Sequence, residues 1–140
     1  MPVPVLVDFG LAGRHLRPGC ATLAYGAPEI WGKMPEGWEQ HPMGADVYAF
    51  ACLAYEVLTG SRLFPGATER GVIQAHLAHD GYPSKLQLWM QEPQLMGLCQ
   101  LLASALRQDP DARITAQELR DGLATLGPEL AKLSWPLRSL

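Results

Sequence analysis

The chain has 140 residues, of which 48% are hydrophobic and 18% are charged, and its formal net charge is −3 at pH 7. A chain of this length forms one domain at most and buries roughly two-thirds of the surface that it exposes when unfolded. The composition excludes extended disorder, and the lack of a basic field argues against nucleic acid or an anionic membrane as a partner.

No segment has the pattern of a secretion signal or a membrane span. The first apolar run lacks a basic flank and ends at Asp8. The longest apolar run, residues 47–58, is shorter than the roughly 20 residues of a spanning helix and contains Glu56. The three cysteines form no CxxC pair, which argues against a zinc ribbon or a disulfide framework. We therefore expect a cytoplasmic protein with no membrane span in this segment.

The N-terminal third of the chain predicts one strand and a long loop. Residues 3–7 are apolar and rich in valine, which favours a short buried strand. Residues 11–25 contain Gly and Pro and have no sustained period, which predicts a loop. A short helix is expected at residues 28–31, followed by a second loop that continues to Met43.

Helices are expected through the remainder of the chain. Residues 46–58 are apolar on every face, the pattern of a helix at the centre of a domain, and Thr59-Gly60 ends it. Three further helices are predicted at residues 67–79, 93–107 and 115–126. Thr68 is the expected N-cap of the first, and Thr115 with Glu118 has the spacing of a capping box. Gly127-Pro128 should terminate the last helix and leave a tail or linker at residues 128–140.

Four motifs occur in a fixed order along the chain. They read DFG, TLAYGAPEI, GADVYAFACLAYEVLTG and LRQDPDARITAQEL. This series resembles the C-terminal lobe of a eukaryotic-type Ser/Thr protein kinase from the DFG motif onward. The stretch LFPGATERGVIQAHLAHDGYP resembles the bacterial branch of that family. The resemblance implies a mainly α fold, with residues 1–127 forming a partial kinase domain that has one N-terminal strand, an activation loop and about four helices.

The resemblance also implies a metal ligand at the end of the first strand. Phosphoryl transfer needs Mg²⁺ to neutralise the phosphates of ATP, and a hard cation prefers carboxylate oxygen. Asp8 matches the family residue that supplies this oxygen. Gly10 permits the sharp turn, and Phe9 can pack in two positions that decide whether Asp8 faces the metal.

Further site residues follow from the same resemblance. Thr22 and Tyr25 belong to the activation segment, and Thr22 lines the groove for a protein substrate. Glu29 of the APE motif should form a buried ion pair with Arg113, a structural role. Asp46 matches the residue that accepts backbone N–H groups of the catalytic loop.

Other residues of interest are expected to have ordinary roles. His76 and His79 are spaced for one helix face, but no third ligand completes a metal site, so a surface pair is expected. Glu56 is either a reader of a basic substrate residue or a helix-face contact. Leu53 and Val57 match positions where the family stacks hydrophobic side chains beneath the adenine.

The 140 residues contain no glycine-rich loop, no phosphate-binding strand lysine and no HRD catalytic loop. Asp8 alone cannot perform the transfer, so whether this chain is an enzyme by itself stays open. Three interpretations remain. The chain is the C-terminal part of a Ser/Thr kinase, a non-catalytic pseudokinase-like scaffold module, or half of a split kinase whose N-lobe is supplied in trans.

Overall fold

The computed structural model describes residues 23–32 and 42–137, and the side chain of Pro42 is not among the parts described. Every regular element in these two ranges is a helix. The expected strand at residues 3–7 lies outside them, as does the loop predicted at residues 11–25 except for residues 23–25, which form a turn. The mainly α fold class predicted from the sequence is confirmed for the described part of the chain.

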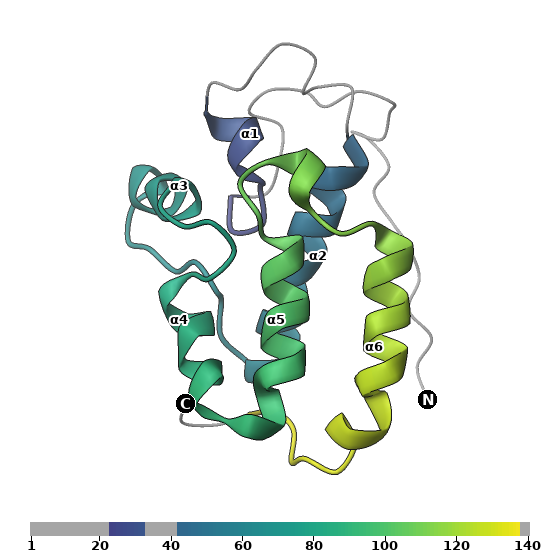
Figure 1. The fold of residues 1–140 in the computed structure, drawn as a ribbon. Coiled ribbons are helices and arrows are strands. Elements are labelled where there is room, and N and C mark those ends of the chain that lie inside the picture. The colour runs from purple at the N-terminus through teal and green to yellow at the C-terminus, as the bar shows by residue number, and fades with distance from the viewer. Residues whose placement is uncertain (1–22, 33–41, 138–140) are drawn as a thin grey trace, which may run out of the picture.

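The long helix α2 (Pro42–Thr59) lies at the centre of the arrangement, with α5 (Met96–Ala105) packed against it. Figure 1 shows α6 (Ala116–Leu130) running beside α5, while α3 (Glu69–Leu77) lies on the opposite side of the molecule. One face of α2 supplies core residues (Val47, Tyr48, Ala51, Cys52, Tyr55). The sequence predicts that this helix starts at Asp46. It begins earlier, at Pro42, and so includes Met43 and Gly44.

Helix α3 is shorter than the predicted range of residues 67–79. It starts directly after Thr68, the predicted N-cap. The Thr68 hydroxyl accepts a hydrogen bond from the Gly71 N–H at 3.1 Å, which satisfies one of the free donors of the first turn. Its N-cap is therefore the residue expected from the sequence.

The segment between α3 and α5 contains short helices that the sequence analysis did not predict. They are α4 (Ser84–Gln87) and two turns of 3₁₀ helix, η2 (Leu88–Gln91) and η3 (Pro93–Leu95). Trp89 is fully buried here, and its ring stacks on Tyr55 with centroids 5.2 Å apart. The helix predicted at residues 93–107 is thus a 3₁₀ turn followed by α5, because Pro93 begins the tighter turn.

Another 3₁₀ turn, η4 (Pro110–Ala112), leads to α6, whose N-terminus has the predicted capping box. The Thr115 hydroxyl accepts from the Glu118 N–H at 3.1 Å, and the Glu118 carboxylate accepts from the Thr115 N–H at 3.2 Å. The predicted end at Gly127-Pro128 is wrong, since α6 continues to Leu130 and the Ala131 N–H still bonds the Gly127 carbonyl at 2.9 Å.

Pro128 is tolerated in α6 because it lies in the last turn, on a side exposed to solvent. The carbonyl one turn earlier that loses its donor can therefore bond water. After the helix the chain returns to α2, where the Leu137 N–H donates to the Leu58 carbonyl at 2.8 Å. The boundary expected at 127/128 therefore falls inside a helix, and the following residues pack on the helical core.

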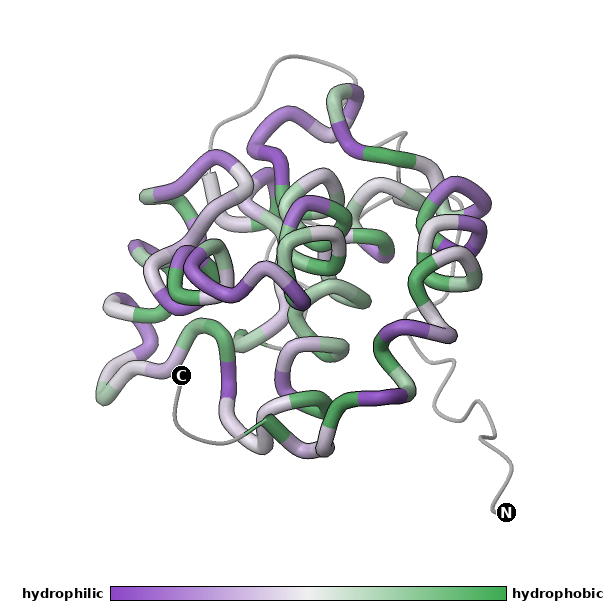
Figure 2. The backbone as a smooth tube through the Cα atoms, turned by 60° about the horizontal axis from the view of Figure 1, so that its bottom comes forward, coloured by the Kyte–Doolittle hydropathy of each residue, from purple (hydrophilic) through white to green (hydrophobic). Residues whose placement is uncertain are grey.

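Polar and apolar stretches alternate along the outer helices in the hydropathy view of Figure 2. The fully buried interior is formed by Trp89, Tyr48 and several leucines from α4, α5 and the turn that follows it (Leu86, Leu98, Leu102, Leu106). No described helix is long and apolar enough to cross a membrane, as the sequence indicated.

Candidate functional site

The candidate site begins in the first described range, residues 23–32. Asp8, Phe9, Gly10 and Thr22 lie outside the described residues. Leu23 and the residues after it form a turn that leads into α1 (Pro28–Trp31). Pro28 occupies the first helical position, where its missing N–H costs nothing, and Glu29 lies in the first turn.

Glu29 and Arg113 form a buried ion pair between α1 and the loop before α6. Arg113 Nη1 lies 2.6 Å from Glu29 Oε1 and Nη2 lies 2.7 Å from Oε2, so the contact is bidentate. Neither side chain has any exposed surface. The pair has the partners that the sequence predicts, separated by 84 positions along the chain.

Arg113 also joins other elements to this pair. Its guanidinium donates to the carbonyls of Arg107, Gly44 and Gln108 at 2.7, 3.0 and 3.3 Å, and its Cζ lies 5.0 Å from the Tyr48 ring centroid. The three donors not used by Glu29 are therefore satisfied by backbone oxygen, and the face of the Tyr48 ring adds a cation–π contact. This arrangement ties the APE turn to the start of α2.

Tyr25 is held by an acidic residue of α2. Its hydroxyl donates to Glu56 Oε2 at 2.7 Å, and the Glu56 carboxylate raises the pKa of Tyr25. Arg62 Nε lies 3.3 Å from the other oxygen of Glu56. Of the two roles considered for Glu56, a contact within the domain is thus present, and it fixes the segment around Tyr25.

Asp46 lies in the first half of α2, and its exposed side chain makes no hydrogen bond to another described residue. The surrounding protein partly desolvates the carboxylate and raises its pKa. The described residues therefore do not supply the backbone donors that the resemblance assigns to this carboxylate.

The same side of α2 carries an exposed apolar stripe. Met43, Phe50, Leu53 and Val57 are spaced by seven, three and four residues, which places them along one face of the helix. Their exposed fractions are 80%, 44%, 45% and 69%. Within the described ranges, neighbouring elements thus cover only one side of the helix that the sequence describes as apolar on every face.

The prediction of a surface pair for His76 and His79 is wrong. His76 is fully buried and His79 is half-buried, and both bond the Tyr48 hydroxyl. His79 lies beyond the end of α3 at Leu77, so the two rings do not share one helix face, although both reach the same hydroxyl of α2. The spacing could not show that the rings pack on α2, because the contact joins residues far apart in the sequence. Within the described ranges no group of three or more His, Cys, Asp or Glu side chains could hold a metal ion.

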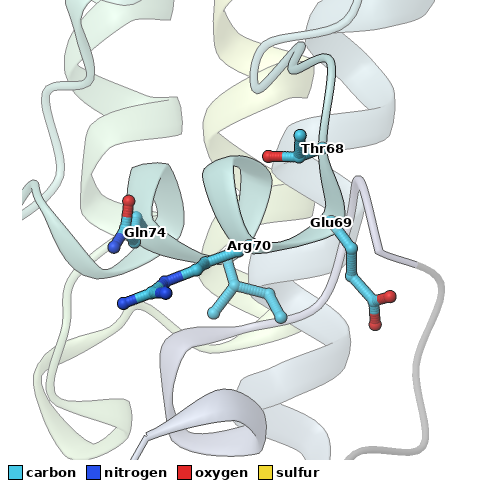
Figure 3. Close-up of a pocket in the computed structure, with 5 residues that line it drawn as sticks. Thr68, Glu69, Arg70 and Gln74 are labelled. Carbon is cyan, nitrogen blue, oxygen red and sulfur yellow. The ribbon is translucent and has the colours of Figure 1, made fainter.

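An open surface hollow of about 580 Å³ lies at the N-terminal end of α3 (Figure 3). It is lined by Thr68, Glu69, Arg70, Ile73 and Gln74. The Glu69 and Arg70 side chains extend away from the helix in different directions. The hollow is widely open, most of the surface that lines it is apolar, and neither Glu29 nor Arg113 is among its lining residues.

Comparison with known proteins identifies the family. The family described as "Protein kinase domain" matches residues 4–122. Serine/threonine-protein kinase PkaB of Streptomyces coelicolor is 32% identical over 93% of this chain, and meiosis induction protein kinase IME2/SME1 of Saccharomyces cerevisiae is 30% identical over 81% of it. Serine/threonine-protein kinase RAD53 of Saccharomyces cerevisiae is 40% identical over 47% of it.

The chain spans only a part of each of these relatives. The aligned region covers 30% of PkaB, 24% of IME2/SME1 and 10% of RAD53. The family match nevertheless includes the APE turn, all of α2 and the Arg113 loop that together build the site. On these grounds the chain belongs to the protein kinase domain family, among the Ser/Thr protein kinases.

Proposed function

We propose that this chain is the activation segment and C-lobe of a Ser/Thr protein kinase, and that it works only with polypeptide that supplies a catalytic loop and an N-lobe. The complete domain transfers the γ-phosphate of ATP to a protein substrate, with Mg²⁺ bound by Asp8. The observation that carries this proposal is the exposed stripe of Met43, Phe50, Leu53 and Val57 on α2.

The exposed stripe favours a further element that covers it, for an energetic reason. Each large apolar side chain that gains full burial contributes roughly 1.5–3 kcal/mol. A contiguous exposed apolar patch on a core helix marks a surface that is covered in the working protein. Asp46 lies on the same side, as a carboxylate with no hydrogen-bond partner among the described residues. An element that packs on the stripe and presents backbone N–H groups would satisfy both features.

The residues of this chain would contribute binding and orientation to the transfer. Asp8 would hold the metal that neutralises charge on the transferred phosphate. Thr22 would line the groove for the protein substrate, and Tyr25, held by Glu56, would fix the segment that follows it. The Glu29–Arg113 pair would keep the APE turn against α2. The catalytic base would come from outside these 140 residues.

The test is a reconstitution. The chain is expressed alone, fused behind a kinase N-lobe with its catalytic loop, and mixed with that segment as a separate protein. Transfer from labelled ATP to casein is measured with Mg²⁺. We expect no transfer from the chain alone and transfer from the fused form. Asp8→Ala should abolish transfer in the active form, whereas Asp121→Ala, a change at an exposed carboxylate of α6, should not.

The other interpretations predict different results in the same assay. Transfer by the separate mixture as fast as by the fusion would identify a split kinase. Binding of the added segment with no transfer in either form would identify a scaffold module. Turnover of ATP by the chain alone, lost in Asp8→Ala, would overturn the requirement for an added lobe.

A further inference from the structure

A tyrosine hydroxyl lies between two imidazole rings at the interface of α2 and α3. The Tyr48 Oη lies 2.8 Å from His76 Nδ1 and 3.0 Å from His79 Nε2. Phe64 packs on both imidazoles, with ring centroids 4.2 Å from His76 and 5.1 Å from His79. Since Tyr48 and His76 are fully buried, every polar atom in this cluster needs a partner.

The two ends of the cluster determine where its protons lie. His76 Nε2 lies 3.0 Å from the Leu23 carbonyl oxygen, which can only accept, so Nε2 carries the proton. The Gly81 N–H donates to His79 Nδ1 at 3.0 Å, so this nitrogen carries none. A neutral His79 therefore bears its proton on Nε2, and a neutral His76 offers an unprotonated Nδ1.

The cluster then forms a single directed chain of hydrogen bonds. His79 Nε2–H donates to the Tyr48 oxygen, the Tyr48 hydroxyl donates to His76 Nδ1, and His76 Nε2–H donates to the Leu23 carbonyl. Each donor meets one acceptor only when both rings are neutral. A proton added to His76 Nδ1 would face the Tyr48 hydroxyl proton, and one added to His79 Nδ1 would face the Gly81 N–H.

The charges around the cluster do not favour a cationic imidazole. Arg113 lies over the Tyr48 ring, and the nearby Glu29 carboxylate is already paired with it. On the α3 side Asp80 is paired with Arg107 at 3.0 Å. Cys52 of α2 is buried, and burial raises the pKa of its thiol, so it stays neutral. Burial lowers the pKa of His76 and of His79 to about 4.

We propose that His76 is a positioning residue for phosphoryl transfer, which holds the main chain at Leu23 through its Nε2–H while Tyr48 and His79 fix its tautomer. The proposal rests on the proposed kinase function, since Leu23 directly follows Thr22 in the segment expected to line the substrate groove. Loss of this hydrogen bond releases the segment at Leu23. The Glu29–Arg113 pair still holds the chain further on, so the effect is local.

The test uses the complete kinase that contains these residues and a matched pair of variants. His76→Gln retains a side-chain N–H that can reach the Leu23 carbonyl, whereas His76→Leu retains none. We expect His76→Leu to raise KM for casein by about tenfold, because a small displacement of a positioning group has a large kinetic effect. KM for ATP should stay within twofold, and His76→Gln should recover most of the loss.

Tyr48→Phe is a milder variant, which keeps the ring on Arg113 and removes only the central hydroxyl. We expect it to raise KM for casein less than His76→Leu does. Tyr82→Phe is the control, since the Tyr82 ring is exposed and its hydroxyl bonds no described residue. Equal KM values for casein in His76→Leu, His76→Gln and the parent would overturn the positioning role.

Two further measurements on the same proteins separate this proposal from the kinase function. Long-range ¹H–¹⁵N spectra should show both imidazoles as Nε2–H tautomers at neutral pH. Amide exchange in residues 22–27 should be faster in His76→Leu than in His76→Gln. An Nδ1–H tautomer at either ring, or equal exchange, would overturn the hydrogen-bond chain. A parent protein that transfers no phosphate would refute the kinase function and the kinetic role of His76, and the spectra and exchange would still decide the anchoring of Leu23.

Discussion

Arg113 uses all five guanidinium N–H groups in hydrogen bonds, and this decides what its removal should cost. It bonds both oxygens of Glu29, three backbone carbonyls and the face of Tyr48. Arg113→Ala leaves a buried carboxylate unpaired, so we expect a loss of about 3–5 kcal/mol in the free energy of unfolding. Chemical denaturation of the complete domain measures it.

Arg113→Lys should recover little of this loss, since an ammonium cannot bond a carboxylate in the bidentate manner. Lys132→Ala is the control, because Lys132 pairs with Glu129 through side chains that are both largely exposed. Such surface pairs contribute little to stability. An unchanged denaturation midpoint for Arg113→Ala would contradict the structural role of the pair.

The buried histidines predict a pH dependence of stability with a definite sign. In the folded chain both rings stay neutral until the pH falls to their pKa of about 4, whereas a histidine of the unfolded chain has a pKa of about 6.5. The unfolded state therefore binds more protons between these values. The free energy of unfolding should be at its full value above pH 6.5 and should fall as the pH is lowered towards 4.

Urea denaturation at several pH values between 5 and 7 checks this sign. The hydrogen bond with Arg107 lowers the pKa of Asp80, so this carboxyl stays ionised across the window. His76→Gln removes one of the two groups, so the slope should fall by about half. A stability that is constant across this range, or that rises on acidification, would show that neither ring is neutral and buried as described.

The proposed activation segment leads to a prediction about regulation. Residues 9–21 contain no Ser, Thr or Tyr, so no phosphate can be attached there to order the loop. Thr22 and Tyr25 are the nearest hydroxyl groups, and Tyr25 already donates to Glu56. After incubation of the complete enzyme with ATP and Mg²⁺, mass spectrometry should find no phosphate in residues 9–21. Phosphate on Thr22 should lower activity, and an activating phosphate on Thr22 would contradict this account.

At the scale of elements, α2 has two faces with opposite environments. Its buried face packs on α5, and its other face carries the stripe of Met43, Phe50, Leu53 and Val57. Phe50→Gln combined with Val57→Gln should reduce aggregation of the isolated chain, because less apolar surface is exposed. The same change should weaken binding of the added N-lobe and catalytic loop. Light scattering and a binding titration measure the two effects.

Leu88→Gln is the matched control, as Leu88 is 42% exposed on η2, which is a different element from α2. It should leave the binding titration unchanged. Equal losses of binding in Leu88→Gln and in the double variant of α2 would show that the stripe is not the docking face.

For the whole molecule, the exposed stripe predicts the behaviour of the isolated 140 residues. A small domain has a net stability of roughly 5–15 kcal/mol, and leaving three or four large side chains uncovered forgoes a comparable sum. We expect a broad thermal transition and binding of an apolar dye by the chain alone. The fusion to an N-lobe should melt sharply and bind little dye. A cooperative melt without dye binding by the isolated chain would favour a self-sufficient scaffold module.

Local sequence signals determined the features that depend on neighbouring residues. The N-cap at Thr68 and the capping box of Thr115 and Glu118 are present as predicted, because a cap bonds the first turn of its own helix. The predicted end of α6 is wrong, although the signals there are also local. Gly127-Pro128 favours termination, and solvent at the exposed last turn offsets that preference.

The resemblance carried by the four motifs led to the family and to the partners Glu29 and Arg113. Asp8, Phe9, Gly10 and Thr22 stay predictions, since they lie outside the described residues. No motif indicated the short helices between α3 and α5. These short helices bury Trp89 against Tyr55 of α2. This contact joins two elements, so the local sequence does not indicate it.

By itself the sequence determined the mainly helical fold class, the N-caps of α3 and α6 and the family, because periodicity, capping and motif order are properties of adjacent residues. Only the tertiary structure decided that His76 is buried and bonded to Tyr48, and that one face of an all-apolar α2 is exposed. Both depend on which elements pack together. The sequence pattern of one helix indicates which side chains are apolar and which share a spacing. The neighbouring elements decide which of these side chains are buried.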